Sequence, residues 1–119
     1  MYSARLLDYF QNPRNPGEVL DANATAEIEN PACGDVLRLS LRIKSGRIEE
    51  IRFKAKGCVP SMACASALTE LVAGQTVVEI RALERDTLIA AVGGLPHAST
   101  HAAQLALDAL SAALNQIRP

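Results

Sequence analysis

The residues best suited to chemistry begin with a thiol and a carboxylate two positions apart. Cys33 and Asp35 flank Gly34, and Pro31 stands just before them. Proline restricts the approach and glycine lets the backbone turn, so two short side chains can converge on one point. Sulfur is a soft metal ligand and a carboxylate a hard, replaceable one, which is typical of part of a metal site. The alternative interpretation is a tight turn that holds a buried cysteine.

A second thiol, Cys58, follows Gly57 and comes just before Pro60, a favourable residue for the start of a helix. The unpaired N–H groups at a helix N-terminus favour a thiolate, so we expect Cys58 to be reactive or metal-binding. A small apolar residue filling a strand–helix corner is the alternative. Cys64 lies among alanines inside the same helix, where packing is the simpler role.

Two histidines, His97 and His101, are four residues apart and would share one face of a continuous helix. Pro96 and the potential helix caps Ser99 and Thr100 interrupt that register. His101, in the first turn of the last helix, is therefore the better single ligand. The sequence contains neither a glycine-rich phosphate loop nor a serine nucleophile elbow.

The elements that must position these residues follow from hydrophobic periodicity. Apolar and polar residues alternate over residues 36–43 and again over 51–55, with Ser45 and Gly46 between them, which predicts an antiparallel hairpin with one solvated face. Residues 24–29 are a weaker candidate for a third strand. Ser3 is expected to cap a first helix that ends at Asn12.

The second half of the sequence has the period of helices. One helix is expected from Pro60 to Gly74, short ones near residues 77–83 and 86–92, and a last one from Ser99 or Thr100. Two apolar stripes are expected, one in each long helix: Met62, Ala65, Leu68, Thr69 and Val72, and then Leu107, Leu110, Leu114 and Ile117. The order of elements predicts an α+β fold, a small three-stranded antiparallel sheet with helices packed on one face.

Composition limits the classes of function. The chain has 119 residues, 49% of them hydrophobic, which suits a single domain over residues 1–119 with one core. A net charge of -1 argues against nucleic acid as a partner. No apolar stretch suits a membrane span or a signal peptide, so we expect a cytoplasmic protein. In that compartment three cysteines favour ligand or thiol chemistry over disulfides.

In order and spacing, several segments resemble the IscU/NifU-type iron–sulfur cluster scaffold family over nearly the whole chain. They are Asn-Pro-Arg-Asn at 12–15, Asn-Pro-Ala-Cys-Gly-Asp at 30–35, Phe-Lys-Ala-Lys-Gly-Cys at 53–58, Ser-Ala-Leu-Thr-Glu at 66–70, and Leu95-Pro96 before His101. The resemblance implies the same fold. It also implies that a [2Fe–2S] cluster is built from iron and from sulfur supplied by a cysteine desulfurase, then passed to apo-proteins.

The resemblance also implies a ligand set. Cys33, Asp35 and Cys58 match the family's first cysteine, its aspartate and its second cysteine, and His101 matches the histidine before its third cysteine. That third cysteine is replaced by Ala102, although in the family it is linked both with ligation and with receiving sulfur.

Two ligand sets without the third cysteine are possible. Cys64 could swing toward the site, or the site could use Cys33, Asp35, Cys58 and His101 alone. Such a mixed set suits zinc or a labile cluster.

Two further departures concern partners. Relatives that use a dedicated chaperone carry Leu-Pro-Pro-Val-Lys, and residues 95–99 keep only the opening Leu-Pro, which argues against that partner. The long insertion of the zinc-dependent SufU branch is absent. The expected partners are a cysteine desulfurase and apo iron–sulfur recipients, and a homo-oligomer that shares a cluster is left open.

Three functional hypotheses follow. The leading one is a scaffold rather than a turnover enzyme, with Cys33 and Cys58 as core ligands, Asp35 tuning release and His101 as the fourth ligand. The alternative is a sulfur-transfer partner with zinc in its resting form that accepts persulfide on Cys58. The third is a degenerate family member that keeps the fold and acts as a binding module.

Overall fold

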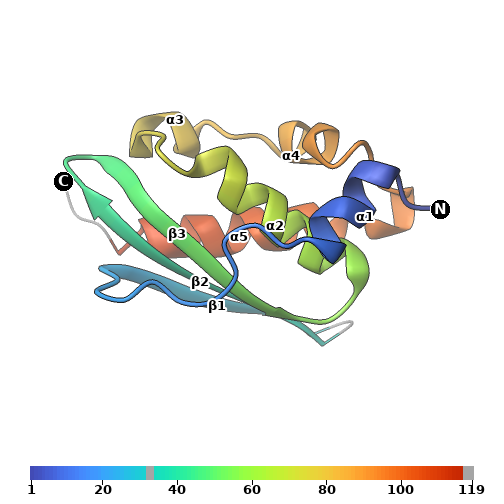
Figure 1. Cartoon of the computed structure of the whole chain (residues 1–119), viewed down its shortest axis with the longest axis horizontal. Coiled ribbons are helices and arrows are strands. Elements are labelled where there is room, and N and C mark those ends of the chain that lie inside the picture. Colours follow the sequence, from blue (N-terminus) through green and yellow to red (C-terminus); the bar gives the residue numbers. More distant parts are fainter. Residues whose placement is uncertain (32–33, 117–119) are drawn as a thin grey trace.

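The sheet has three antiparallel strands in the order β1-β2-β3 (Figure 1). The computed structural model describes residues 1–31 and 34–116, and its strands are β1 (Ala24–Asn30), β2 (Asp35–Lys44) and β3 (Arg47–Lys56). The predicted hairpin is confirmed, with Ser45 and Gly46 at positive φ in its turn. Residues 24–29 form the third strand despite their weak propensity, because β1 pairs along β2 from Ala24 opposite Leu41 to Asn30 opposite Asp35.

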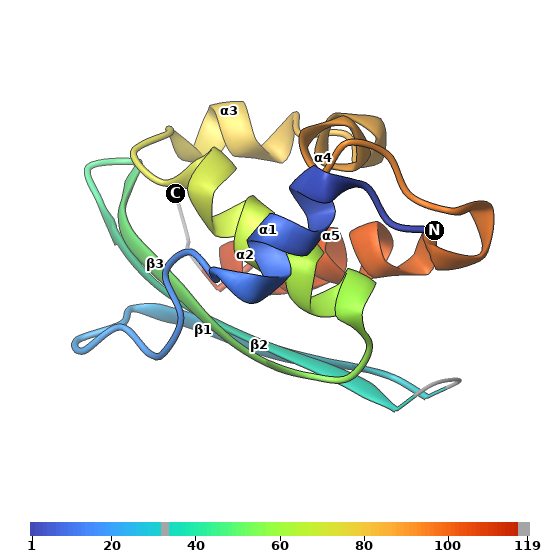
Figure 2. The same cartoon turned by 45° about the vertical axis from the view of Figure 1, so that its right-hand side comes forward.

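The helices cover one face of this sheet, as expected (Figures 1 and 2). They are α1 (Ala4–Gln11), α2 (Val59–Val72), α3 (Val77–Arg81), α4 (Arg85–Ala91) and α5 (His101–Leu114), with a short 3-10 turn, η1 (His97–Ser99), before α5. Both α2 and α5 contact the sheet, α1 lies on α2, and α4 packs against both long helices. No helix in the described part of the chain combines the length and apolarity that a membrane crossing requires.

Helix α2 differs from its predicted amphipathic pattern. Instead of one apolar stripe, residues 63–69 are all buried, including Ser66 and Thr69. The many small side chains of α2 let the sheet, α1, α4 and α5 approach it from several sides. It is therefore the central helix of the core, where a helix buried all round is expected.

The core face of α5 consists mostly of alanine. Of the predicted stripe, Leu110 and Leu114 are buried, Leu107 is half-buried and Ile117 lies outside the described residues. The rest of the buried face is formed by smaller side chains and one further leucine: Ala102, Ala103, Leu105, Ala106, Ala109 and Ala113. Small side chains allow close helix–helix and helix–sheet approach. The buried face of α5 is therefore wider than the predicted stripe of leucines.

The outer face of the sheet is less open than the strand pattern predicts. Residues 15–23 first run beside β3, where Phe53 N–H donates to the Asn15 carbonyl at 3.0 Å. They then cross β2, where the Val19 N–H donates to Ser40 Oγ at 2.8 Å. Both Val19 and Ser40 are buried as a result. The crossing is required because the chain must pass from the β3 edge to the β1 edge.

Candidate metal centre

Three predicted ligands converge at one end of the sheet. One oxygen of Asp35, the sulfur of Cys58 and one ring nitrogen of His101 all lie within 4.8 Å of one another. Each comes from the start of a different element: Asp35 is the first residue of β2, Cys58 is the N-cap of α2, and His101 is the first residue of α5. The fourth predicted ligand, Cys33, lies outside the described residues.

Strand pairing explains how Asp35 and Cys58 meet. Gly34 has φ +72° and its N–H donates to the Asn30 carbonyl at 2.7 Å, which turns the chain into β2. Val36 pairs with Lys56, so the end of β3 lies beside the start of β2. The chain then leaves β3 through Gly57 and places Cys58 against Asp35.

The carboxylate of Asp35 is held by the start of α2. Its Oδ1 accepts from the Cys58 N–H at 3.0 Å. Its Oδ2 accepts from the Ser61 hydroxyl at 2.7 Å and lies 3.1 Å from Cys58 Sγ. Asp35 is only 2% exposed, and an anion in that position benefits from donors and from the positive end of the helix dipole.

His101 approaches the same carboxylate from the other side. Its Nε2 lies 3.9 Å from Asp35 Oδ2, and its side chain is 39% exposed. Its Nδ1 lies 3.2 Å from the Ala98 carbonyl. If Nδ1 carries the proton, its N–H donates to that carbonyl and the lone pair of Nε2 is left available to a metal ion. Metal-ligating histidines use this arrangement.

The other predicted residues lie elsewhere. Cys64 is fully buried in the middle of α2, and burial raises the pKa of its thiol to about 12, with a smaller contribution from Cys58. The structure does not bring Cys64 into the group of ligands. His97 lies in η1, four residues before His101 but outside the continuous helix. Ala102, where the family resemblance implies a third cysteine, is 1% exposed.

Sequence reasoning missed Ser61. Its hydroxyl contacts both Asp35 Oδ2 and Cys58 Sγ, at 2.7 and 3.2 Å. The available signal was its spacing, because a residue three positions after Cys58 lies one helical turn further along the same face of α2. The residue type gave no signal, since serine is rarely a metal ligand.

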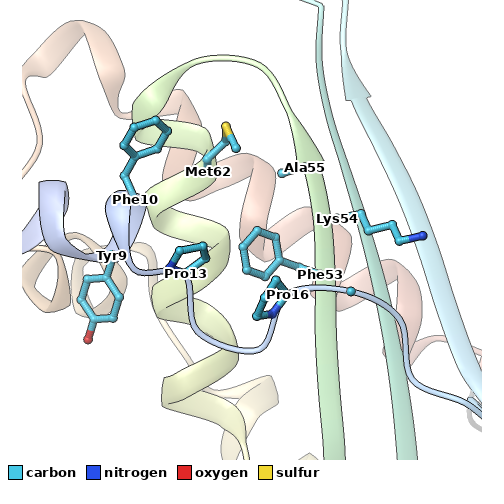
Figure 3. A pocket seen from close by; sticks show the side chains of 9 residues that line it. Tyr9, Phe10, Pro13, Pro16, Phe53, Lys54, Ala55 and Met62 are labelled. Carbon is cyan, nitrogen blue, oxygen red and sulfur yellow. The ribbon is translucent and has the colours of Figure 1, made fainter.

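An apolar groove lies near the ligands but does not include them (Figure 3). It has a volume of about 260 Å³ and is formed by α1, the segment after it, β3 and the first turn of α2. Figure 3 shows Met62 beside Phe10 at one end and Phe53 beside Pro16 at the other. Ser61 and Met62 are neighbours, so the first turn of α2 presents one side to the ligands and another to the groove.

The three donor types fit a small tetrahedral site. Tetrahedral ligands at about 2.0–2.3 Å from zinc lie about 3.3–3.8 Å from one another. Sγ of Cys58 and Nε2 of His101 are 3.1 and 3.9 Å from the same oxygen of Asp35. Small side-chain movements would therefore bring sulfur, oxygen and nitrogen to one ion, with a further ligand needed to complete the site.

This fold and this donor set are those of a small metal- or cluster-binding domain. The family described as NifU-like N terminal domain matches residues 1–118, and this chain belongs to that family. The iron–sulfur cluster assembly scaffold protein IscU 1 of Archaeoglobus fulgidus is 41% identical over 96% of this chain and 74% of its own length. The protein IscU of Azotobacter vinelandii, with the same description, is 38% identical over 98% of this chain and 94% of its own.

A solved structure shows the same architecture. The N-terminal part of a nitrogen-fixing NifU-like protein from Brucella abortus superimposes with a TM-score of 0.79, covering 97% of this chain and 92% of that chain. The two sequences are 22% identical, so this likeness concerns the fold. The α+β fold and the family resemblance expected from the sequence are both confirmed.

Proposed function

We propose that this chain is a scaffold on which an iron–sulfur cluster is assembled and from which it is transferred. The ligands would be Cys33, Asp35, Cys58 and His101. The observation that carries the proposal is the convergence of a sulfur, an oxygen and a nitrogen atom from three separate elements within 4.8 Å. Similarity to the IscU proteins of two organisms supports the same role.

The ligand chemistry favours a cluster that is held temporarily. Thiolates bind iron–sulfur clusters firmly, whereas a carboxylate and an imidazole replace two thiolates here. The site is also accessible, since Cys58 is half-buried and the His101 side chain is 39% exposed. We therefore expect a [2Fe–2S] cluster that forms with sulfur from a cysteine desulfurase and passes readily to apo-proteins.

The test is anaerobic reconstitution with ferrous iron, cysteine and a cysteine desulfurase. Visible absorption, together with iron and sulfide analysis, identifies the cluster. Cys33→Ser and Cys58→Ser should each abolish its formation. Cys64→Ala is the matched control, because it removes a thiol that lies outside the group of ligands, and it should leave the cluster intact.

Each outcome has a defined meaning. Full cluster content in both Cys33→Ser and Cys58→Ser would contradict the assignment. Loss of the cluster in Cys64→Ala without loss of folding would place Cys64 among the ligands. Half the expected iron and sulfide per chain would indicate one cluster shared by two copies. Inertness toward both iron and the desulfurase would support the binding-module hypothesis.

A second function is favoured by Ala102, which stands where the family resemblance implies a third cysteine. In it, zinc occupies the site and Cys58 accepts sulfur. The Cys58 thiolate would attack the outer sulfur of the desulfurase persulfide, and the desulfurase cysteine would leave as a thiolate, so no oxidant is consumed. Retained zinc, no cluster, and faster desulfurase turnover that depends on Cys58 would identify this function.

A further inference from the structure

We infer that Ser61 is a positioning residue of the metal site, acting by holding the carboxylate of Asp35 toward Cys58 and His101. The inference rests on the proposed function, because it concerns the same ligands. Ser61 is only 5% exposed, and its hydroxyl oxygen lies 2.7 Å from Asp35 Oδ2 and 3.2 Å from Cys58 Sγ. The Ser61 hydroxyl thus contacts both the carboxylate of Asp35 and the thiol of Cys58.

The direction of this hydroxyl is unusual for a serine in a helix. Such hydroxyls commonly donate back to a carbonyl three or four residues earlier. Thr69 in the same helix does so, donating to the Ser66 carbonyl at 2.8 Å. Ser61 has a single hydroxyl hydrogen and directs it instead to a carboxylate on another element, 26 residues away in sequence.

Among the described residues, two contacts at the start of α2 hold the carboxylate of Asp35. The backbone N–H of Cys58 holds Oδ1 at 3.0 Å, and the Ser61 hydroxyl holds Oδ2 at 2.7 Å. Oδ2 is the oxygen that faces the ligands, because Nε2 of His101 is 3.9 Å from it. Once the Cys58 thiol has lost its proton to bind a metal, Oδ2 can direct a lone pair to the ion while it still accepts from Ser61.

The Ser61 contact, like that of the Cys58 N–H, is compatible with metal binding. Cys58 Sγ also lies 3.1 Å from Oδ2, but a cysteine must lose its proton to bind a metal, and this hydrogen bond is then lost. The Ser61 hydroxyl keeps its proton and continues to orient Oδ2. Removing a partner that orients a metal ligand typically weakens metal affinity about 10–100-fold.

The experiment is an anaerobic titration of the full chain with Co²⁺, followed by its thiolate charge-transfer absorption. Ser61→Ala should weaken Co²⁺ binding about 10–100-fold and alter the band intensities. Ser66→Ala is the matched control: Ser66 is also buried in α2, but it lies more than one helical turn beyond Ser61 and its hydroxyl accepts from the Arg14 N–H at 2.9 Å. Its Co²⁺ affinity should equal that of the unaltered chain.

A second pair of variants separates the hydroxyl from packing. The threonine and valine side chains of Ser61→Thr and Ser61→Val have nearly the same shape, and only threonine keeps the hydroxyl. Ser61→Thr should bind Co²⁺ about as tightly as the unaltered chain, and Ser61→Val should match Ser61→Ala. Equal Co²⁺ affinity in Thr and Val variants would overturn the inference, whereas failure of the unaltered chain to bind Co²⁺ would overturn the proposed function itself.

Discussion

Gly57 packs directly against the carboxylate of Asp35. A methyl group at Gly57 would lie 2.6 Å from Asp35 Cγ and would overlap Oδ1, and Gly57 has a φ of +146° that favours glycine. The residue between β3 and Cys58 therefore has no side chain because the carboxylate occupies that space. The end of β3 can approach Asp35 this closely because residue 57 is glycine.

Replacing this glycine tests the relationship. Gly57→Ala should displace the Asp35 carboxylate and weaken Co²⁺ binding by at least about tenfold, since a ligand and its orienting contacts are disturbed together. Gly74→Ala is the control, because Gly74 also has a positive φ, +80°, but a methyl group there would meet no atom within 4 Å. It should lose stability from backbone strain alone. Equal Co²⁺ affinities in the two variants would contradict the role given to Gly57.

The two histidines should behave differently. His101→Ala removes a ring nitrogen that lies 3.9 Å from Asp35 Oδ2 and should weaken Co²⁺ binding by more than about tenfold. His97→Ala changes a residue of η1 outside the group of ligands and should leave the affinity unchanged. Isothermal titration calorimetry of both variants provides the comparison. A larger effect from His97 than from His101 would require a different ligand set.

Cys64 should make stability depend on pH in the alkaline range. Its pKa rises from 9.0 to about 12 on folding, so the unfolded chain loses this proton first as the pH increases. The contribution is complete below pH 9.0 and decreases above it, by up to about 1.4 kcal/mol per pH unit until the folded thiol also ionises.

Urea unfolding of the unaltered chain and of Cys64→Ala measures this contribution. The difference between their free energies of unfolding should shrink as the pH rises above 9.0, the ordinary pKa of the thiol. Curves that stay parallel would show that Cys64 is not buried as a neutral thiol. In the native state at neutral pH, a thiol reagent should also leave Cys64 unmodified.

Ser3 should stabilise the N-terminal helix. Its Oγ accepts from the Leu6 N–H at 2.9 Å and donates to the Val92 carbonyl at 2.5 Å, so it caps α1 and connects it to the end of α4. Ser3→Ala should lower the free energy of unfolding by about 1–2 kcal/mol, as for other N-caps. Ser111→Ala, at an exposed position of α5, is the control in the same urea titrations. A change no larger than that of Ser111→Ala would argue against the cap.

Much of the fold was predictable from local patterns. The alternation around Leu39 and Phe53 predicted two paired strands, and these residues do lie opposite each other in β2 and β3. The cap at Ser3 and the start of the last helix near Thr100 were also correct, because both depend on nearby residues. The burial of α2 on several sides was not predictable, since small residues carry little periodic signal.

For the site, sequence reasoning selected Asp35, Cys58 and His101, which the structure brings together. It found them from residue type, local position and resemblance. It did not decide whether Cys64 faces the site, and it missed the contact of Ser61 with Asp35. Both depend on the packing of segments that are far apart in the chain. The metal-binding role of these residues is the subject of the experiments above.

The sequence by itself determined the elements and their order, because periodicity, caps and turn residues act over a few positions, and it indicated the candidate ligands by residue type. Only the tertiary structure decided which atoms meet. The register of β2 with β3 sets Asp35 beside Cys58, and the packing of α5 on the sheet brings His101 to the same oxygen. Packing on all sides of α2 likewise buries Cys64 in the core while Ser61 contacts the carboxylate, since burial depends on contacts between segments far apart in the chain.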